Sequence, residues 1–147
     1  MGSRVGRSPK IHLVDSGLAG ALCGLTADRL ASRDPALLTE FGHLLETFVV
    51  GEILKQASWQ DEPLQVSHLR THDGVALDAL METFDGRVAA VEVKAGSQVR
   101  PADLRGLRLL RDRLGHRFVA GVALHLGPLG YTAEDRIQIC PVDRLWS

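Results

Sequence analysis

The spacing of apolar residues predicts two long helices. Between 38 and 56 the sequence LTEFGHLLETFVVGEILKQ repeats apolar residues at helical intervals, which predicts an amphipathic helix despite Gly42 and Gly51. The segment 100–115, RPADLRGLRLLRDRLG, places a leucine every three or four residues. Pro101 stands where the first turn of this second helix would begin, and the glycine at its end is a typical stop.

The region between and after these helices has the pattern of β-strands. Three strand-like runs are joined by the turn sequences HDG and FDG, which predicts an antiparallel meander over 64–71, 75–83 and 88–95. The continuous apolar run at 118–126, FVAGVALHL, is typical of a strand covered on both faces. The tail predicts an edge strand near 136–142, followed by a closing turn.

The N-terminal region predicts smaller elements. Residues 10–15, KIHLVD, have the pattern of a short strand, and 16–25, SGLAGALCGL, that of a small-residue helix. Residues 1–9 are expected to be a disordered leader. We therefore predict a single domain over 10–147 of the α/β class (an α+β mixed sheet). Its core, 40–126, has the order αβββαβ, and the N-terminal helix is an extension of it.

Composition narrows the classes of function. The chain has 147 residues, 45% of them apolar and 24% charged, with a net charge of −1, so a generally basic nucleic-acid-binding surface is excluded. The two cysteines have neither a CxxC arrangement nor zinc spacing. No GxxxxGK[ST] motif occurs, so we expect no ATP site of the P-loop kind. No signal peptide or membrane span is evident, which predicts a cytoplasmic protein without a membrane partner.

One strand carries an acid and a base among valines and alanines. Side chains alternate between the faces of a strand, so Val91 and Val93 can enter a core while Glu92 and Lys94 share the other face. Asp78 lies on the preceding strand. Converging carboxylates would repel one another by about 4 kcal/mol for a pair 4 Å apart at an effective dielectric of 20. One lysine does not neutralise them fully, and the resulting oxygen-rich pocket suits Mg²⁺ or Mn²⁺.

The connection between these two strands decides whether such a pocket forms. A strict two-residue turn at the FDG sequence would pair Asp78 with Val93 and send the two carboxylates to opposite faces. A loop of three residues that ends at Gly86 with a bulge would place Asp78 opposite Glu92 or Lys94. We predict the second register.

The motifs LDALME and VEVKAG together resemble the D…ExK core of the PD-(D/E)xK, or restriction-endonuclease-like, superfamily. The resemblance implies Mg²⁺-dependent hydrolysis of phosphodiester bonds, with DNA as the substrate. It implies that Asp78 and Glu92 bind the metal, that Glu46 on the preceding helix completes the shell through water, and that Lys94 positions the attacking water. These four residues are the predicted catalytic set, and the three acids are the predicted metal ligands.

A narrower resemblance extends over nearly the whole chain. The runs KIHLVDSGLAGALCGL, GHLLETFVVGEILKQASW, HLRTHDGVALDALME, VAAVEVKAGSQVRPADLRGLRLL and CPVDRLW are similar to a domain of unknown function that follows an AAA-type ATPase domain in many prokaryotic proteins. That family implies an ATPase domain fused upstream. It often reads EVD at the second strand, where this sequence reads ALD, with Ala76 in place of the glutamate.

Three alternatives stay open from the sequence. Glu92 and Lys94 could form only a cross-strand salt bridge on a solvated sheet. Arg105, Arg108 and Arg111 could bind nucleic-acid phosphates, or could form the solvated face of their helix. The whole domain could be a catalytically silent nuclease fold that serves an ATPase as a binding or regulatory module, or as a dimerisation domain in a homo-oligomer.

Overall fold

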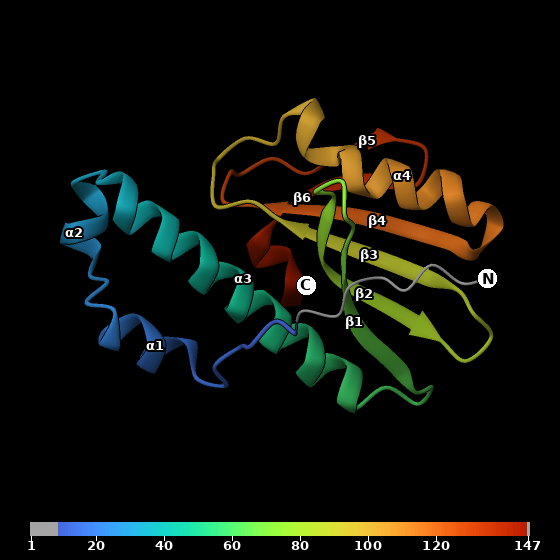
Figure 1. Cartoon of the computed structure of the whole chain (residues 1–147), viewed down its shortest axis with the longest axis horizontal. Coiled ribbons are helices and arrows are strands. Elements are labelled where there is room, and N and C mark those ends of the chain that lie inside the picture. The colour runs from blue at the N-terminus through green and yellow to red at the C-terminus, as the bar shows by residue number, and fades with distance from the viewer. Residues whose placement is uncertain (1–8, 147) are drawn as a thin grey trace.

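The computed structural model describes residues 9–146 (Figure 1). Residues 1–8 of the predicted leader lie outside this range. The α-helices are α1 (Ser16–Leu22), α2 (Ala27–Ala31), α3 (Pro35–Ser58) and α4 (Arg105–Leu114). The strands are β1 (Leu64–Arg70), β2 (Ala76–Thr83), β3 (Val88–Val93), β4 (Phe118–His125), β5 (Tyr131–Glu134) and β6 (Ile137–Pro141). Short 3₁₀ turns are η1 (Pro101–Leu104), η2 (Gly115–Arg117) and η3 (Val142–Trp146).

The strands form one mixed sheet in the order β1-β2-β3-β4-β6-β5. The β1-β2-β3 part is an antiparallel meander, as predicted, whereas β3, β4 and β6 run parallel. Helix α4 is the crossover between the parallel strands β3 and β4. The predicted α/β class and the αβββαβ order of the core are confirmed.

The sheet separates two apolar clusters. On β3, Ala90 belongs to the cluster with Leu107 of α4, whereas Val91 belongs to the cluster with Val49 of α3. Because neighbouring residues of a strand face opposite ways, α3 and α4 cover opposite faces of the sheet. The ribbon shows α3 extending past the sheet to carry α1 and α2 (Figure 1).

Helix α3 differs in part from its predicted form. Asp34 caps its N-terminus and Pro35 begins it, so the helix starts earlier than expected. Leu45, Val49 and Ile53 are buried at helical spacing, as predicted. Apolar residues on other parts of the helix, however, are exposed to solvent, so the sequence is less amphipathic than the spacing indicated.

The predicted strand at residues 10–15 does not form. Among residues 9–146 no strand pairs with this segment, and Ile11 and Val14 are 89% and 95% exposed. Side chains hold the segment on α3 instead, as in the contact between His12 Nδ1 and Thr47 Oγ1 at 3.1 Å. The alternation of apolar and polar residues was real, but a strand also needs a partner for its backbone groups.

Two further elements differ from the prediction. The expected helix at 16–25 ends at Leu22, and Thr26 caps an additional short helix, α2. The expected edge strand near 136–142 is β6, but β6 lies between β4 and β5 and is not at the edge. Arg136, with a positive φ of 55°, forms the tight turn that folds β5 back along β6.

No helix within residues 9–146 is both long enough and apolar enough to cross a membrane.

A matched pair of glycine variants tests the packing of α4 on the sheet. A Cβ added at Gly106 would lie 2.9 Å from Ala76 O and 3.0 Å from a methyl carbon of Leu77, whereas a Cβ at Gly51 meets nothing within 4 Å. Gly106→Ala should lower the free energy of unfolding by about 1–3 kcal/mol through overpacking. Gly51→Ala should raise it by roughly 0.5–1 kcal/mol through helix propensity. Urea denaturation of both variants measures the difference, and equal effects would contradict the packing described here.

Candidate functional site

Residues 84–87 connect β2 to β3, and the loop itself consists of Phe84, Asp85 and Gly86, since Thr83 and Arg87 are bonded to each other. Thr83 N–H donates a hydrogen bond to Arg87 O at 3.0 Å, which closes the loop. Gly86 has a φ of +82°, the left-handed conformation that glycine adopts without strain. This is the predicted three-residue loop that ends at Gly86.

The loop fixes the register of the two strands. Ala79 pairs with Val91, and the pairing continues without a break as far as Glu82 and Val88. This is the register of the predicted three-residue loop. Regular pairing ends at Ala79 and Val91, and Asp78 and Glu92 are the next residues along; here Val93 N–H donates to the side chain of Asp78 at 2.8 Å. The two carboxylates are therefore neighbours just beyond the last regular pair, and the charge of Asp78 acts on Glu92.

Asp78 lies at an irregularity in the pairing of β2 with β1. Leu77 pairs with Leu69 and Leu80 pairs with Ser67, so three steps along β2 match two steps along β1. The buried residues on either side of Asp78 pack into different apolar clusters, on opposite faces of the sheet. Such bulges redirect side chains and are common beside functional sites. Because of this bulge, the side chains of β2 do not alternate regularly between the two faces of the sheet at Asp78.

Asp78, Glu46 and Lys10 form the first of two ion-paired groups. Lys10 Nζ lies 2.5 Å from Glu46 Oε1 and 3.1 Å from Asp78 Oδ1. The other oxygen of Asp78 accepts a hydrogen bond from Val93 N–H at 2.8 Å. Burial alone would lower the pKa of Lys10, but the hydrogen bonds and negative charges of the two carboxylates outweigh it and raise the pKa. Lys10 is therefore a charged ammonium shared by α3 and β2.

Glu92, Lys94 and Asp103 form the second group. Lys94 Nζ lies 2.7 Å from Glu92 Oε1 and 3.7 Å from Asp103 Oδ1. The other oxygen of Asp103 accepts a hydrogen bond from Arg100 N–H at 2.8 Å, in the capping box of η1. Burial alone would lower the pKa of Lys94, but the hydrogen bond to Glu92 and the surrounding negative charges raise it. Lys94 is thus also a charged donor.

Glu92 is the most buried acid of the two groups, at 8% exposure. Burial raises its pKa to about 7; the repulsion of Asp78 adds to this effect, and the hydrogen bond and charge of Lys94 oppose it. Its Oε2 atom is buried and has no hydrogen-bond partner within residues 9–146. A buried carboxylate oxygen of this kind is costly unless a further partner binds it.

The predicted metal ligands come close together without forming a finished metal site. Asp78 and Glu92 lie just beyond the last regular pair of β2 and β3, and Lys10 joins Asp78 to Glu46. In the part of the chain that the structure describes, no three acidic, histidine or cysteine side chains are grouped closely enough to hold a metal. The donors are nevertheless carboxylate oxygens, which hard cations prefer, and one buried oxygen of Glu92 is unused. These oxygens are of the kind that would hold a divalent cation, and in this structure the ammonium of Lys10 bonds two of the acids, Glu46 and Asp78.

Sequence reasoning identified four members of the two groups and missed Lys10 and Asp103. Lys10 was assigned to a short strand, and Asp103 to the start of a helix. The composition offers a signal for Lys10, because the chain has lysine only at positions 10, 55 and 94. Two of these three lysines are in the site. The third, Lys55, is in an exposed pair with Glu52, so a lysine in this arginine-rich chain is a weak pointer to the site.

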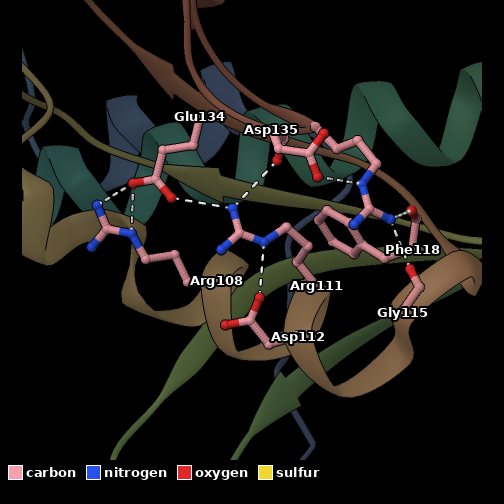
Figure 2. Close-up of polar contacts among 8 residues, drawn as sticks. Arg108, Arg111, Asp112, Gly115, Phe118, Glu134 and Asp135 are labelled. Carbon is pink, nitrogen blue, oxygen red and sulfur yellow. Dashed lines mark hydrogen bonds and ion pairs between the residues drawn. The ribbon is translucent and has the colours of Figure 1, made fainter.

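The arginines predicted to bind phosphate have other partners in this structure. Arg108 donates from Nε and Nη2 to Glu134 Oε1, at 2.7 and 2.5 Å, and Arg111 Nη1 lies 3.1 Å from Glu134 Oε2 (Figure 2). Arg111 also contacts Asp112. These bonds tie α4 to the end of β5. Arg105 is exposed at the start of α4, and the predicted contact of all three arginines with phosphate stays a prediction.

Arg136 continues the same network on the other side of the β5–β6 turn. Its Nη1 atom donates to the carbonyl oxygens of Gly115 and Phe118, at 2.7 and 2.8 Å, and its Nε atom lies 2.9 Å from Asp135 Oδ2 (Figure 2). The guanidinium therefore satisfies backbone acceptors at the end of α4. This cluster has a structural role in joining α4 to the strands.

The raised pKa of Glu92 predicts a specific dependence of stability on pH. Between about pH 4.5 and pH 7 the folded protein keeps Glu92 protonated, whereas the unfolded chain, at the ordinary pKa of 4.5, releases that proton. The folded state binds more protons, so the Glu92 contribution to the free energy of unfolding falls as pH rises through this window, by about 3 kcal/mol at most. Glu92→Gln should remove this slope. Urea denaturation of both proteins at pH 5 and pH 7.5 measures it, and a wild-type-minus-variant difference that does not change with pH would contradict the assignment.

Comparison with known proteins gives one family. A family model described as a domain of unknown function, DUF4143, matches residues 41–145, which include most of α3, the whole sheet and both ion-paired groups except Lys10. No curated protein and no solved structure matches the chain significantly. The match covers well over half of the sequence, and the chain belongs to the DUF4143 family.

Proposed function

We propose that this domain is a metal-dependent phosphodiesterase domain of the PD-(D/E)xK kind, acting on DNA. The observation that carries the proposal is the closeness of Asp78 and Glu92 just beyond the last regular pair of β2 and β3, with Lys94 two residues after Glu92 and bonded to it. An acid on one strand facing an E-x-K pair on the next is the arrangement that the resemblance to the superfamily implies. In this structure the arrangement depends on the β2–β3 register, which the loop at Gly86 sets by its backbone geometry.

The cation of this proposal is Mg²⁺ or Mn²⁺. Asp78 and Glu92 would hold it, and Glu46 would complete the shell through water. When bound, such a cation polarises a phosphoryl oxygen and lowers the pKa of a bound water. The unused, buried Oε2 atom of Glu92 is the observation that supports a further positive partner at this position.

Lys94 acts as a charged hydrogen-bond donor in the proposed reaction. Its pKa is raised, so at neutral pH the side chain carries a proton and does not serve as the base. It can orient the attacking water and offset the negative charge that develops on the phosphate. Asp103 holds the ammonium from the other side and keeps it near Glu92.

The partners follow from the same proposal. DNA is the substrate class that the superfamily resemblance favours, and Arg105 is the exposed member of the three α4 arginines, so it is the one best placed to meet a phosphate. The narrower resemblance favours an ATPase domain fused upstream. Such a domain would couple ATP hydrolysis elsewhere to the phosphodiester chemistry proposed here.

A second function has its own support. A catalytically silent domain, which binds or regulates an ATPase or mediates dimerisation, would keep the fold and lose the need for a metal. The Lys10 ammonium already supplies a positive charge to Glu46 and Asp78, and this favours the silent alternative. The two functions differ in cation affinity and in cleavage.

Cation binding is the first test. Isothermal titration should detect Mn²⁺ binding to the wild-type protein and at least about a tenfold loss of affinity in Asp78→Asn, which keeps the side-chain shape and loses the charge. Glu40→Gln, an exposed acid-to-amide change on the same helix as Glu46, is the matched control and should bind like the wild type. Equal affinity in all three proteins would remove Asp78 from the site, and absence of binding would overturn the metal-dependent function.

Cleavage is the second test. Nicking of supercoiled plasmid DNA in Mg²⁺ should fall by about a hundredfold or more in Lys94→Gln, because a positioned charge that acts in the transition state is lost. Lys55→Gln makes the same change at an exposed surface pair with Glu52 and should keep the wild-type rate. Cation binding without any nicking by the wild type would instead support the silent, metal-binding alternative.

A further inference from the structure

The N-terminal segment places a lysine among the carboxylates of the proposed cation site. We infer that Lys10 is a built-in competitor of the divalent cation, so that binding of the cation to Asp78 displaces Lys10 and releases residues 9–14 from α3. This inference rests on the proposed function, because it assigns a regulator to the same site. It concerns the residues of this chain and does not depend on the reaction that the site performs.

The contacts of Lys10 carry the inference. Its ammonium bonds one oxygen of Glu46 and one oxygen of Asp78, at 2.5 and 3.1 Å, from residues 36 and 68 positions away in the sequence. The second oxygen of Asp78 is already taken by Val93 N–H. A cation that binds Asp78 must therefore share or replace the oxygen that Lys10 uses. Two positive charges on one oxygen repel each other, so the ammonium leaves.

The segment around Lys10 can leave at small cost. Residues 9–14 form no regular structure, and the apolar side chains of Ile11 and Val14 are almost fully exposed. Little apolar surface is lost from the core when the segment moves. Apart from Lys10, the polar side-chain contact with α3 is that of His12 with Thr47. Asp15 accepts a hydrogen bond from Leu18 N–H and so caps α1, and the released segment should therefore end before Asp15.

The consequence is a reciprocal coupling between the site and the N-terminal segment. If the cation displaces Lys10, then holding Lys10 in place weakens cation binding by the same factor. Any contact that pulls residues 9–14 away from α3 would therefore raise the affinity of the site. Through Lys10, the chain that precedes α1 gains control over whether the carboxylates are available.

Variants of Lys10 test the inference by calorimetry. Lys10→Gln removes the competing charge and should bind Mn²⁺ about tenfold more tightly than the wild type, since a charge-assisted hydrogen-bond pair no longer has to be broken. Lys10→Arg keeps a competing cation and should stay within about twofold of the wild type. Lys55→Gln removes the same charge from an exposed ion pair on α3, and its Mn²⁺ affinity should also stay within about twofold of the wild type. Thermal melts of each variant confirm that the domain remains folded.

A second readout follows the segment itself. In a ¹⁵N-labelled wild-type protein, saturation with diamagnetic Mg²⁺ should move the amide resonances of residues 11–14 to the positions they have in Lys10→Gln without metal. Equal Mn²⁺ affinities of the wild type and Lys10→Gln, or unchanged resonances of 11–14 at saturation, would overturn the competitor role and leave the metal site standing. Absence of Mn²⁺ binding in both proteins would overturn the metal site and the inference together.

Discussion

The structure depends on how the charges of two facing acids are compensated. Asp78 and Glu92 follow the last regular pair of β2 and β3, and the negative charge of Asp78 acts on Glu92. Their repulsion would cost about 4 kcal/mol at 4 Å and an effective dielectric of 20. The chain compensates with one lysine on each side: Lys10 bonds Asp78, and Lys94 bonds Glu92. The positions of the N-terminal segment and of η1 follow from this, because Lys10 and Asp103 come from them.

Backbone geometry brings the two acids close together. The loop that ends at Gly86 sets the register of the hairpin, and the bulge beside Asp78 releases that residue from the ordinary alternation. A shift of one residue would put Val93 opposite Asp78 and separate the two acids. The closeness of the two acids therefore depends on the positive φ of Gly86 and on the one-residue bulge in β2. Both are local features of the hairpin.

This locality explains what could be predicted from the sequence. The FDG turn and the alternation in VEVKAG act over a few residues, so the sequence limits the hairpin to two registers. The three-residue loop is the register that a shared pocket for Asp78 and Glu92 requires, and the structure has it. The partner of Asp78 does not, since Lys10 is 68 residues away and reaches it from a segment without regular structure. For the same reason KIHLVD gave a wrong strand: its alternation matches that of a strand, but no sheet edge receives it. The sequence does not predict β5, because this strand is short and largely polar. Its partner is β6, to which the turn at Arg136 connects it.

The two ionic clusters of the protein differ in a way that separates structure from function. Around Glu134 both carboxylate oxygens are bonded by arginines, and the cluster lies at the surface, where it joins α4 to β5. In the other cluster Glu92 itself is buried, although Lys94 and Asp103 are partly exposed; one oxygen of Glu92 lacks a hydrogen-bond partner within residues 9–146, and its pKa is raised to about 7. A cluster that served stability alone would have no reason to keep a buried carboxylate incompletely bonded, because such an atom costs free energy. Groups kept in this costly state are concentrated at binding and catalytic sites. The incomplete hydrogen bonding of Glu92, compared with the complete bonding of Glu134, is the physical reason why we propose the function at the junction of β2 and β3.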